Sequence, residues 1–228
     1  MPERCPLCEA RLSPFVTVAT GRKNAQHPLA FLECPTCRLV VRDPAAWPDR
    51  DAERAHYMLH ENDADDSAYR CFLAPSIERM RGLLSPGKNA LDFGCGPDSA
   101  LIAVAREAGV EMLGYDPLFA PDEASLNAAT YDLITCTETV EHLHRPRAVF
   151  DRIARLLRPG GWLIVQTGFA PEAARFPDWH YWRDPTHVIF FRARTFEWLA
   201  ALHGWRVVEI AAPVAVFAKP RSEAPLIP

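Results

Sequence analysis

Two Cys-x-x-Cys pairs, at residues 5–8 and 34–37, stand near the start of the chain. Each pair brings two thiolates within reach of one ion, and together they supply the four soft ligands that Zn²⁺ favours in a tetrahedral site. Because protein then fills every position, the site is structural, and metal binding supplies folding energy that so short a segment lacks. We predict zinc here, with redox-active or incidental pairs as alternatives; the ligands are Cys5, Cys8, Cys34 and Cys37.

A glycine turn supplies the second group of chemically suggestive residues. Gly94 and Gly96 follow a short apolar segment, so the backbone can turn tightly and approach a ligand closely. Asp116 comes twenty residues after Gly96, where a carboxylate can accept hydrogen bonds from both hydroxyls of a ribose. NAD and an adenosyl cofactor both fit these features. Asp92 favours S-adenosyl-L-methionine, because a carboxylate there suits an ammonium and a sulfonium better than a pyrophosphate.

Two further segments carry histidine and aromatic side chains that could orient a nucleophile and remove its proton. Imidazole suits this task because its pKa lies near neutrality. We favour the histidine that ends residues 179–187 as the base; alternatively, it hydrogen-bonds its own loop and its aromatic neighbours belong to the core. The other segment is residues 56–62. The candidate catalytic residues are His187, His142, Tyr57 and His60, and the candidate substrate-binding residues are Trp179, His180 and Tyr181.

The elements that must position these residues alternate along the chain. Strands that alternate with helices predict βαβ units, and therefore an α/β fold with a doubly wound, mostly parallel sheet. The last two strands are too close in sequence for a crossover helix, so one of them must be antiparallel. Expected strands are 90–93, 110–115, 131–136, 162–166, 205–210 and 214–218, and expected helices include 75–84, 101–108, 146–157 and one that Thr195 caps.

The chain divides into three predicted parts. Residues 1–43 form a zinc-ribbon-like module, and residues 44–69 form a linker and lid segment. Residues 70–220 form the main domain, with a substrate-side insertion at about 168–191. In an open parallel sheet, ligands bind beyond the carboxyl ends of the strands, which is where the glycine turn and Asp116 fall.

Several motifs in this order resemble the class I S-adenosylmethionine-dependent methyltransferases over about residues 70–218. They are Asp92-x-Gly94-x-Gly96, Asp116, residues 138–143 (Glu-Thr-Val-Glu-His-Leu) and residues 157–161 (Leu-Arg-Pro-Gly-Gly). The resemblance implies a Rossmann-like fold, with the glycines along the methionine part of the cofactor and residues 137–141 below the sulfonium. It makes His142 a pocket residue first and a catalyst second. The cofactor-binding predictions are Asp92, Gly94, Cys95, Gly96, Asp116, Thr137, Glu138 and Arg70, the last pairing with the cofactor's carboxylate.

Two features depart from the family's pattern. Asp98 occupies the position of the usual third glycine of the loop. Fourteen residues separate Asp116 from Tyr131, too few for the usual helix and third strand at full length. Asn127 and Glu123 are the candidates for the adenine contact in this shortened stretch.

Composition limits the classes of partner. The chain carries 25 Lys and Arg against 29 Asp and Glu, a net charge of −4, which argues against a broad nucleic-acid surface. No run of 18 apolar residues and no signal-like start is present, so we expect a cytoplasmic protein without a membrane span. Nothing in the sequence indicates the oligomeric state.

The main prediction is methyl transfer from S-adenosylmethionine to oxygen or carbon of a small metabolite. The reaction would be an in-line displacement with a histidine as general base. The first alternative is an RNA- or protein-modifying methyltransferase that docks its substrate through the zinc module, which a basic groove between module and pocket would favour. The second is a binding domain that keeps the fold and lacks the chemistry.

Overall fold

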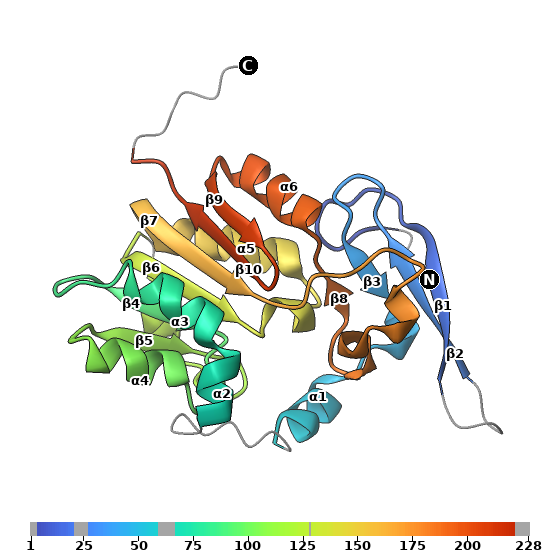
Figure 1. Ribbon diagram of the computed structural model, residues 1–228, viewed down its shortest axis with the longest axis horizontal. Coiled ribbons are helices and arrows are strands. Elements are labelled where there is room, and N and C mark those ends of the chain that lie inside the picture. Colours follow the sequence, from blue (N-terminus) through green and yellow to red (C-terminus); the bar gives the residue numbers. More distant parts are fainter. Residues whose placement is uncertain (1–3, 21–26, 59–66, 128, 222–228) are drawn as a thin grey trace.

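The computed structural model describes residues 4–20, 27–58, 67–127 and 129–221, which form two separate sheets (Figure 1). The larger sheet has six strands in the order β5-β4-β6-β7-β10-β9, and the smaller has four in the order β1-β2-β3-β8. The larger sheet comprises β4 (Ala90–Phe93), β5 (Met112–Tyr115), β6 (Tyr131–Thr137), β7 (Leu157–Gln166), β9 (Arg206–Ala211) and β10 (Val214–Ala218).

The pairing of these strands confirms the predicted sheet. β4 lies parallel to β5 and β6, and β6 lies parallel to β7. β10 pairs antiparallel with both β7 and β9, so β10 is the reversed strand that the short connection required. In the described part of residues 117–130, the regular structure is a single 3-10 helix, η2 (Glu123–Leu126), so β5 forms the edge of the sheet.

Helices cover both faces of the larger sheet. α3 (Ala74–Arg81) and α4 (Ala100–Glu107) pack on one face, and α5 (Pro146–Leu156) and α6 (Ala193–His203) pack on the other. Successive strand residues point to opposite faces, so Leu133 contacts the α3–α4 cluster while Ile134 belongs to the α5–α6 cluster. The central strands β4, β6, β7 and β10 are therefore largely buried on both sides, whereas the edge strands β5 and β9 keep exposed residues.

Two predicted local features differ in detail. α6 begins at Ala193, before the predicted cap Thr195. Arg192 is the N-cap, and the Thr195 hydroxyl reaches back to accept the Arg192 backbone N–H at 3.2 Å, because a threonine in the third helical position can close the first turn. The predicted turn at residues 158–161 forms the irregular start of β7, with Gly160 in a left-handed conformation.

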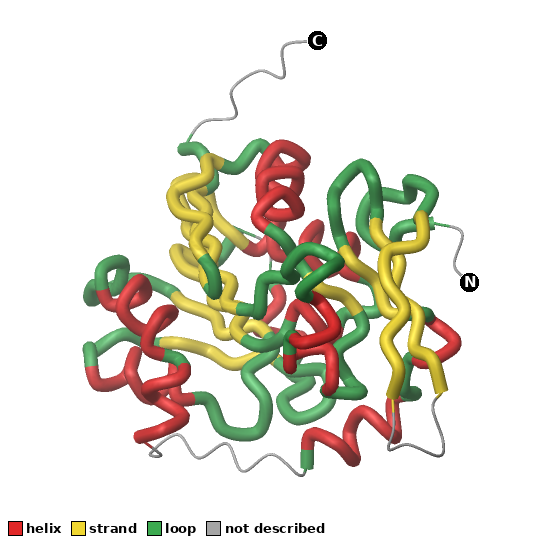
Figure 2. Tube along the Cα trace, turned by 45° about the vertical axis from the view of Figure 1, so that its right-hand side comes forward, coloured by secondary structure: helices red, strands yellow, loops and turns green. Residues whose placement is uncertain are grey.

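The smaller sheet joins the N-terminal module to the insertion. β1 (Ser13–Thr20), β2 (His27–Glu33) and β3 (Val40–Arg42) are antiparallel, and β8 (Ile189–Phe190) of the insertion pairs with β3. The core continues across this junction, because Leu7 and Leu39 of the module belong to the same buried cluster as Phe196 of α6. Figure 2 shows the loops and short helices of the insertion between the two sets of strands.

The described parts of residues 44–72, which include the predicted linker and lid segment, contain η1 (Pro44–Ala46), α1 (Arg50–Tyr57) and α2 (Ser67–Phe72). Three further 3-10 turns lie near the carboxyl ends of the strands and in the insertion: η3 (Val140–His142), η4 (Phe176–Asp178) and η5 (His180–Arg183). No helix in the described part of the chain has the length and apolar character needed to cross a bilayer.

Candidate active site

A cavity of about 880 Å³, called the main cavity below, opens at the carboxyl ends of β4, β5 and β6. Its walls come from the turn after β4, the ends of β5 and β6, helix α1 and the end of the insertion. This is where an open parallel sheet binds ligands. Of the predicted site residues, those that line it are Tyr57, Gly94, Cys95, Gly96, Asp116, Thr137, Glu138, His142 and His187.

The glycine turn needs glycine for two different reasons. Gly94 has a φ of +82°, and a Cβ placed there would lie 2.2 Å from Cγ2 of Thr139. The Thr139 hydroxyl donates to the Gly94 carbonyl at 3.2 Å, so the two loops are packed directly together. Gly96 has a φ of +63°, and its Cβ position faces open space. The first glycine is required by packing, and the second by its left-handed backbone.

Asp92 lies beneath this turn. Its side chain is 4% exposed, and its two oxygens accept hydrogen bonds from Ser99 Oγ at 2.6 Å and Thr135 Oγ1 at 2.7 Å. Burial raises the pKa of the Asp92 carboxyl, and these hydrogen bonds oppose the shift. Asp92 is not part of the cavity lining, so the structure places its carboxylate as a tie between β4, β6 and the start of α4.

Asp116 ends β5 and faces the main cavity. One oxygen accepts the backbone N–H of Gly96 at 3.2 Å, and the other accepts those of Leu118 at 2.8 Å and Phe119 at 3.1 Å. A carboxylate has about four acceptor positions, so Asp116 retains capacity for ribose hydroxyls. The carboxylate thus fixes the glycine turn and remains available to a ligand.

The donor set of the main cavity fits an adenosyl cofactor. The Oγ1 atom of Thr137 is buried in the wall without a hydrogen-bond partner, which leaves a polar atom for a ligand to satisfy. Gly96, also in the lining, leaves the space of a side chain open. Arg70 lies elsewhere: it donates to Glu107 at 2.9 Å and is not part of the cavity lining. The Cys95 sulfur packs against Gly114, where a Cβ would approach it to 2.9 Å.

Glu138 is strained and half-buried. Its φ of +48° is rare for a residue with a side chain, and such strain clusters at functional sites. The Tyr181 hydroxyl donates to Glu138 at 2.9 Å and also contacts the fully buried carboxylate of Glu141. Burial, and then the neighbouring Glu141, raise the pKa of Glu138 well above its ordinary value.

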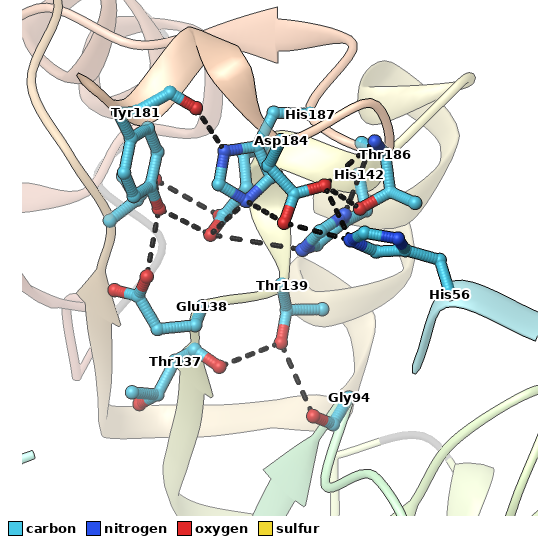
Figure 3. A network of polar contacts seen from close by, with 12 residues as sticks. His56, Gly94, Thr137, Glu138, Thr139, His142, Tyr181, Asp184, Thr186 and His187 are labelled. Carbon is cyan, nitrogen blue, oxygen red and sulfur yellow. Dashed lines mark hydrogen bonds and ion pairs between the residues drawn. The ribbon is translucent and has the colours of Figure 1, made fainter. Parts of the chain in front are cut away.

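Two histidines converge on the same point (Figure 3). The His142 and His187 rings lie 4.7 Å apart between centroids. Nδ1 of His187 donates to the Tyr181 carbonyl at 2.7 Å, and Nδ1 of His142 donates to the Thr186 carbonyl at 3.0 Å. A carbonyl only accepts, so both Nδ1 atoms carry hydrogen, and each ring in its neutral form keeps a lone pair on Nε2. Burial lowers the pKa of His142 to about 4.

Asp184 and α1 complete this wall. Asp184 accepts from the Thr186 hydroxyl at 2.6 Å, and Nε2 of His56 lies 3.2 Å from its carboxylate. Burial would raise the pKa of Asp184, but these hydrogen bonds and the nearby imidazoles outweigh it and lower the pKa to about 2. The Tyr57 ring meets His142 edge-on at 5.0 Å. The predicted catalytic residue His60 lies outside the described residues.

The three predicted substrate-binding residues stand behind the cavity wall. Trp179 stacks on Tyr181 at 5.1 Å and packs against Phe176, within an aromatic cluster of the insertion. Tyr181 supports Glu138 and Glu141, and His180 is exposed. None of Trp179, His180 and Tyr181 lines the main cavity. The insertion turns the Trp179 and Tyr181 rings into its own core, and His180 faces solvent.

Arg42 of β3 holds the insertion in place. Its guanidinium is buried and donates to the backbone carbonyls of Trp182, Asp184 and Pro185, the last two at 2.6 and 3.4 Å. Neither Arg42 nor Asp184 was singled out from the sequence as a site residue, and Glu141 was placed only at the end of the segment below the sulfonium. The Asp-Pro-Thr sequence before His187 was the available signal, since an aspartate there forms a turn by accepting the N–H two residues on, here at 2.8 Å.

The four paired cysteines meet at one point in the N-terminal module. The Cys5–Cys37 and Cys8–Cys34 sulfurs are 3.6 and 3.3 Å apart, and all four lie within 4.8 Å of one another. A tetrahedral ion with 2.3 Å Zn–S bonds separates its sulfurs by about 3.8 Å, so the donor set fits zinc. The two Cys-x-x-Cys turns, called the cysteine knuckles below, have the same geometry. In each, the carbonyl of the first cysteine accepts the backbone N–H of a residue in the left-handed conformation, Glu9 or Arg38, at 2.9 Å.

The chain is similar to known proteins in sequence. A family described as a methyltransferase domain matches residues 66–210. The ubiquinone biosynthesis O-methyltransferases of Sodalis glossinidius (strain morsitans) and Cronobacter sakazakii (strain ATCC BAA-894) are 32% and 34% identical to it over 113 residues. Each alignment covers 40% of this chain and 45% of the relative, so the chain spans about half the length of the curated relatives it matches.

Solved structures share the fold. A 1,6-didemethyltoxoflavin-N1-methyltransferase from Burkholderia thailandensis has a TM-score of 0.57 at 17% identity and covers 88% of this chain and 98% of its own. An S-adenosylmethionine-dependent methyltransferase from Archaeoglobus fulgidus has a TM-score of 0.53 at 16% identity and covers 72% of this chain and 99% of its own. The fold, with the glycine turn and Asp116 at the carboxyl ends of its strands, is that of the class I S-adenosylmethionine-dependent methyltransferases. The chain belongs to the methyltransferase-domain family that matches residues 66–210.

Proposed function

We propose that this chain transfers a methyl group from S-adenosyl-L-methionine to an oxygen or carbon atom of a small metabolite. One observation carries the proposal: the glycine turn with Asp116 and the His142–His187 pair open into the same cavity. A cofactor held by the first group and a nucleophile held by the second would meet there. A cavity of about 880 Å³ lies near the upper end of the roughly 300–1,000 Å³ range of ligand pockets.

Different residues of the cavity would bind the cofactor, remove the proton and orient the acceptor. The Gly94–Gly96 turn would hold the methionine part of the cofactor, Asp116 would hold the ribose, and Thr137 would contact the atoms near the sulfur. S-adenosylmethionine bound there supplies an electrophilic methyl group. On the opposite wall, His187 Nε2 would take the proton of the acceptor hydroxyl as the new bond to the methyl carbon forms and the bond to sulfur breaks. His142 and Tyr57 would orient the acceptor.

The charge of the cavity supports a small acceptor over a nucleic acid. Its charged lining residues include more carboxylates than guanidinium groups, which opposes phosphate binding. The sequence relatives are named O-methyltransferases, which favours oxygen as the atom methylated. The charged residues of the lining are Asp49, Glu53, Asp116, Glu138 and Asp184 against Arg50, Arg145 and Arg152.

We further infer that Cys5, Cys8, Cys34 and Cys37 hold a structural zinc ion. The convergence of four sulfurs within 4.8 Å supports this assignment. The ion would keep the module folded, and β3 would then hold the insertion that carries His187. The zinc module would thus support the wall of the active site through its packing.

Cofactor binding tests the proposal directly. Calorimetric titration should show S-adenosylmethionine and S-adenosylhomocysteine binding to the purified protein. Asp116→Asn should weaken binding by about 10- to 100-fold, because it replaces a charged acceptor of two ribose hydrogen bonds. Asp178→Asn, an exposed change in the insertion, should leave the affinity unchanged. If the protein binds neither ligand at millimolar concentration, the proposed function is wrong.

A further inference from the structure

Three potential metal ligands meet at the wall of the main cavity, far in sequence from the cysteine pairs. Nε2 of His142 and Nε2 of His187 each lie 4.0 Å from the same oxygen, Oε1 of Glu141. All three ligand atoms lie within 4.8 Å of one another. We propose that His142, His187 and Glu141 form a second metal site, which binds a divalent transition-metal ion at the acceptor end of the cavity.

The outer hydrogen bonds of the two histidines support a metal site. A metal-ligating histidine almost always donates its other ring N–H to a carbonyl or carboxylate, which fixes the ring and its tautomer. Both rings do so here, through the carbonyls of Thr186 and Tyr181. In the neutral form of each ring, Nε2 therefore keeps a lone pair, and both Nε2 atoms face the Glu141 carboxylate at 4.0 Å.

The carboxylate ligand is equally well oriented. Glu141 is fully buried, and its other oxygen accepts from the Thr167 hydroxyl at 3.0 Å. The Tyr181 hydroxyl contacts Oε1 itself. Ligating carboxylates are characteristically held by such hydrogen bonds. A buried carboxylate also needs a nearby positive charge, and a bound cation would supply it.

Binding of an ion requires the ligands to close in. With bonds of about 2.1 Å, ligands of a tetrahedral ion are roughly 3.4 Å apart, so the two 4.0 Å separations from Glu141 must shorten by about 0.6 Å. The two Nε2 atoms lie within 4.8 Å of each other and must approach to the same separation. Asp184 lies 3.9 Å from the same Nε2 of His187 and could approach as a further ligand. His142, Asp184 and His187 line the main cavity, so the ion would keep an open face toward the acceptor.

Two imidazoles and one carboxylate with open positions are typical of catalytic Zn²⁺ and of non-haem Fe²⁺ sites. The chemistry rests on the proposed methyl transfer and revises only its proton-removal step, because the Nε2 lone pair of His187 is used to bind the ion. An acceptor hydroxyl that binds the ion becomes more acidic and releases its proton to cavity water. The resulting oxygen anion then forms the bond to the methyl carbon while the bond from that carbon to sulfur breaks. In the loaded site, the imidazoles hold the ion, and the ion's acidity replaces direct proton removal by His187.

The test counts metal sites without using turnover. Purified protein is loaded with one equivalent of Zn²⁺ for the cysteines and then titrated with Co²⁺, with absorption spectra recorded. We expect a second equivalent to bind with ligand-field bands and without sulfur-to-cobalt charge transfer, which excludes the thiolate site. His142→Ala and His187→Ala should each abolish this second equivalent, whereas His180→Ala, which removes an exposed imidazole of the same insertion, should retain it.

Retention of one zinc and of S-adenosylmethionine binding shows that the variants remain folded. The inference is overturned if the wild-type protein takes up no second equivalent, or if that equivalent survives in both histidine variants. Calorimetry on the same samples separates the two proposals. Cofactor binding without the second metal contradicts this inference alone, and a second metal without cofactor binding contradicts the proposed function alone.

Discussion

Gly94 and Glu138 both hold left-handed backbone conformations, on facing loops of the same cavity. Gly94 does so at no steric cost, and its missing side chain is what lets the loop rest on Thr139. Glu138 has a Cβ and is strained, and its carboxylate shares the Tyr181 hydroxyl with Glu141. At the scale of single residues, the site therefore depends on close backbone approach and on buried carboxylates held by hydrogen bonds.

The approach of Gly94 to Thr139 predicts a specific penalty for Gly94→Ala. A Cβ in the left-handed region costs roughly 1–2 kcal/mol, and overpacking against Thr139 adds about 1 kcal/mol or more. Gly109→Ala is the matched control, because Gly109 has a φ of +71° and nothing within 4 Å of its Cβ position. Denaturant unfolding should show the larger loss for Gly94→Ala, and only this variant should lose cofactor binding. Equal losses in the two variants would contradict the packing argument.

Glu53 of α1 predicts a pH dependence of stability. Burial, and then the nearby Asp116 carboxylate, raise the pKa of Glu53 to about 7. Since the folded-state value exceeds the unfolded value of about 4.3, ionisation opposes folding, and the free energy of unfolding should fall as pH rises from about 4 to 7. Glu53→Gln should flatten the curve in this window, and Glu111→Gln, an exposed change, should not. Unfolding measured at pH 5 and pH 8 checks this, and identical slopes in all three proteins would refute it.

At the scale of elements, the insertion between β7 and α6 belongs structurally to the N-terminal module. β8 extends the module's sheet through Val40–Phe190 and Val41–Ile189 pairing. Arg42 then fixes the loop that leads to His187, because a planar guanidinium can donate to several carbonyls at once. The acceptor wall is thus built by two segments nearly 150 residues apart in the chain.

These hydrogen bonds of Arg42 predict a local effect of Arg42→Lys. A lysine offers a point charge and cannot span the carbonyls of residues 182, 184 and 185. Loss of one charge-assisted hydrogen bond, worth about 1.5 kcal/mol, should speed amide exchange across residues 184–188 by about tenfold. Exchange in β4 and β6 should be unchanged, as should every segment in the control Arg11→Lys, an exposed change in the module. Uniform acceleration across both sheets would show a global rather than a local role.

At the scale of the whole molecule, one hydrophobic cluster runs from the cysteine knuckles to the far helices of the larger sheet. It contains Cys34 and Leu39 of the module, Phe191 of the insertion and Phe196 of α6. Residues that share a buried core lose their packing together. The proposed zinc ion therefore contributes to the stability of the active-site wall as well as to that of its own module.

The continuous core predicts that Cys37→Ser destabilises the entire protein. Loss of one thiolate ligand should remove the proposed zinc, and the melting temperature should fall by at least about 10 °C in a single transition. Cys71→Ser provides the control, because Cys71 is exposed and outside the cluster. Calorimetric scans with parallel zinc analysis test this. A separate early transition of the module, with the main transition unchanged, would contradict a shared core.

The features that depend on local pattern could be predicted from the amino-acid sequence. Alternating apolar periods predicted the parallel sheet, because strand and helix faces must be buried. The Gly94–Gly96 turn and Asp116 were predictable because consecutive βα units place the carboxyl ends of their strands at one edge. The convergence of the two cysteine pairs was predictable, because four thiolates at that spacing have few uses other than binding one metal ion.

Tertiary structure alone decided which side chains share the acceptor wall. His142 and His187 meet because β8 adds to β3 and Arg42 holds the intervening loop, and no local pattern encodes contacts over such separations. The same packing turned Trp179 and Tyr181 inward and buried Asp92 under the glycine turn. Local sequence pattern specifies helices and strands because it reflects interactions between near neighbours. The site forms only when segments that are distant in sequence pack against one another in the same core.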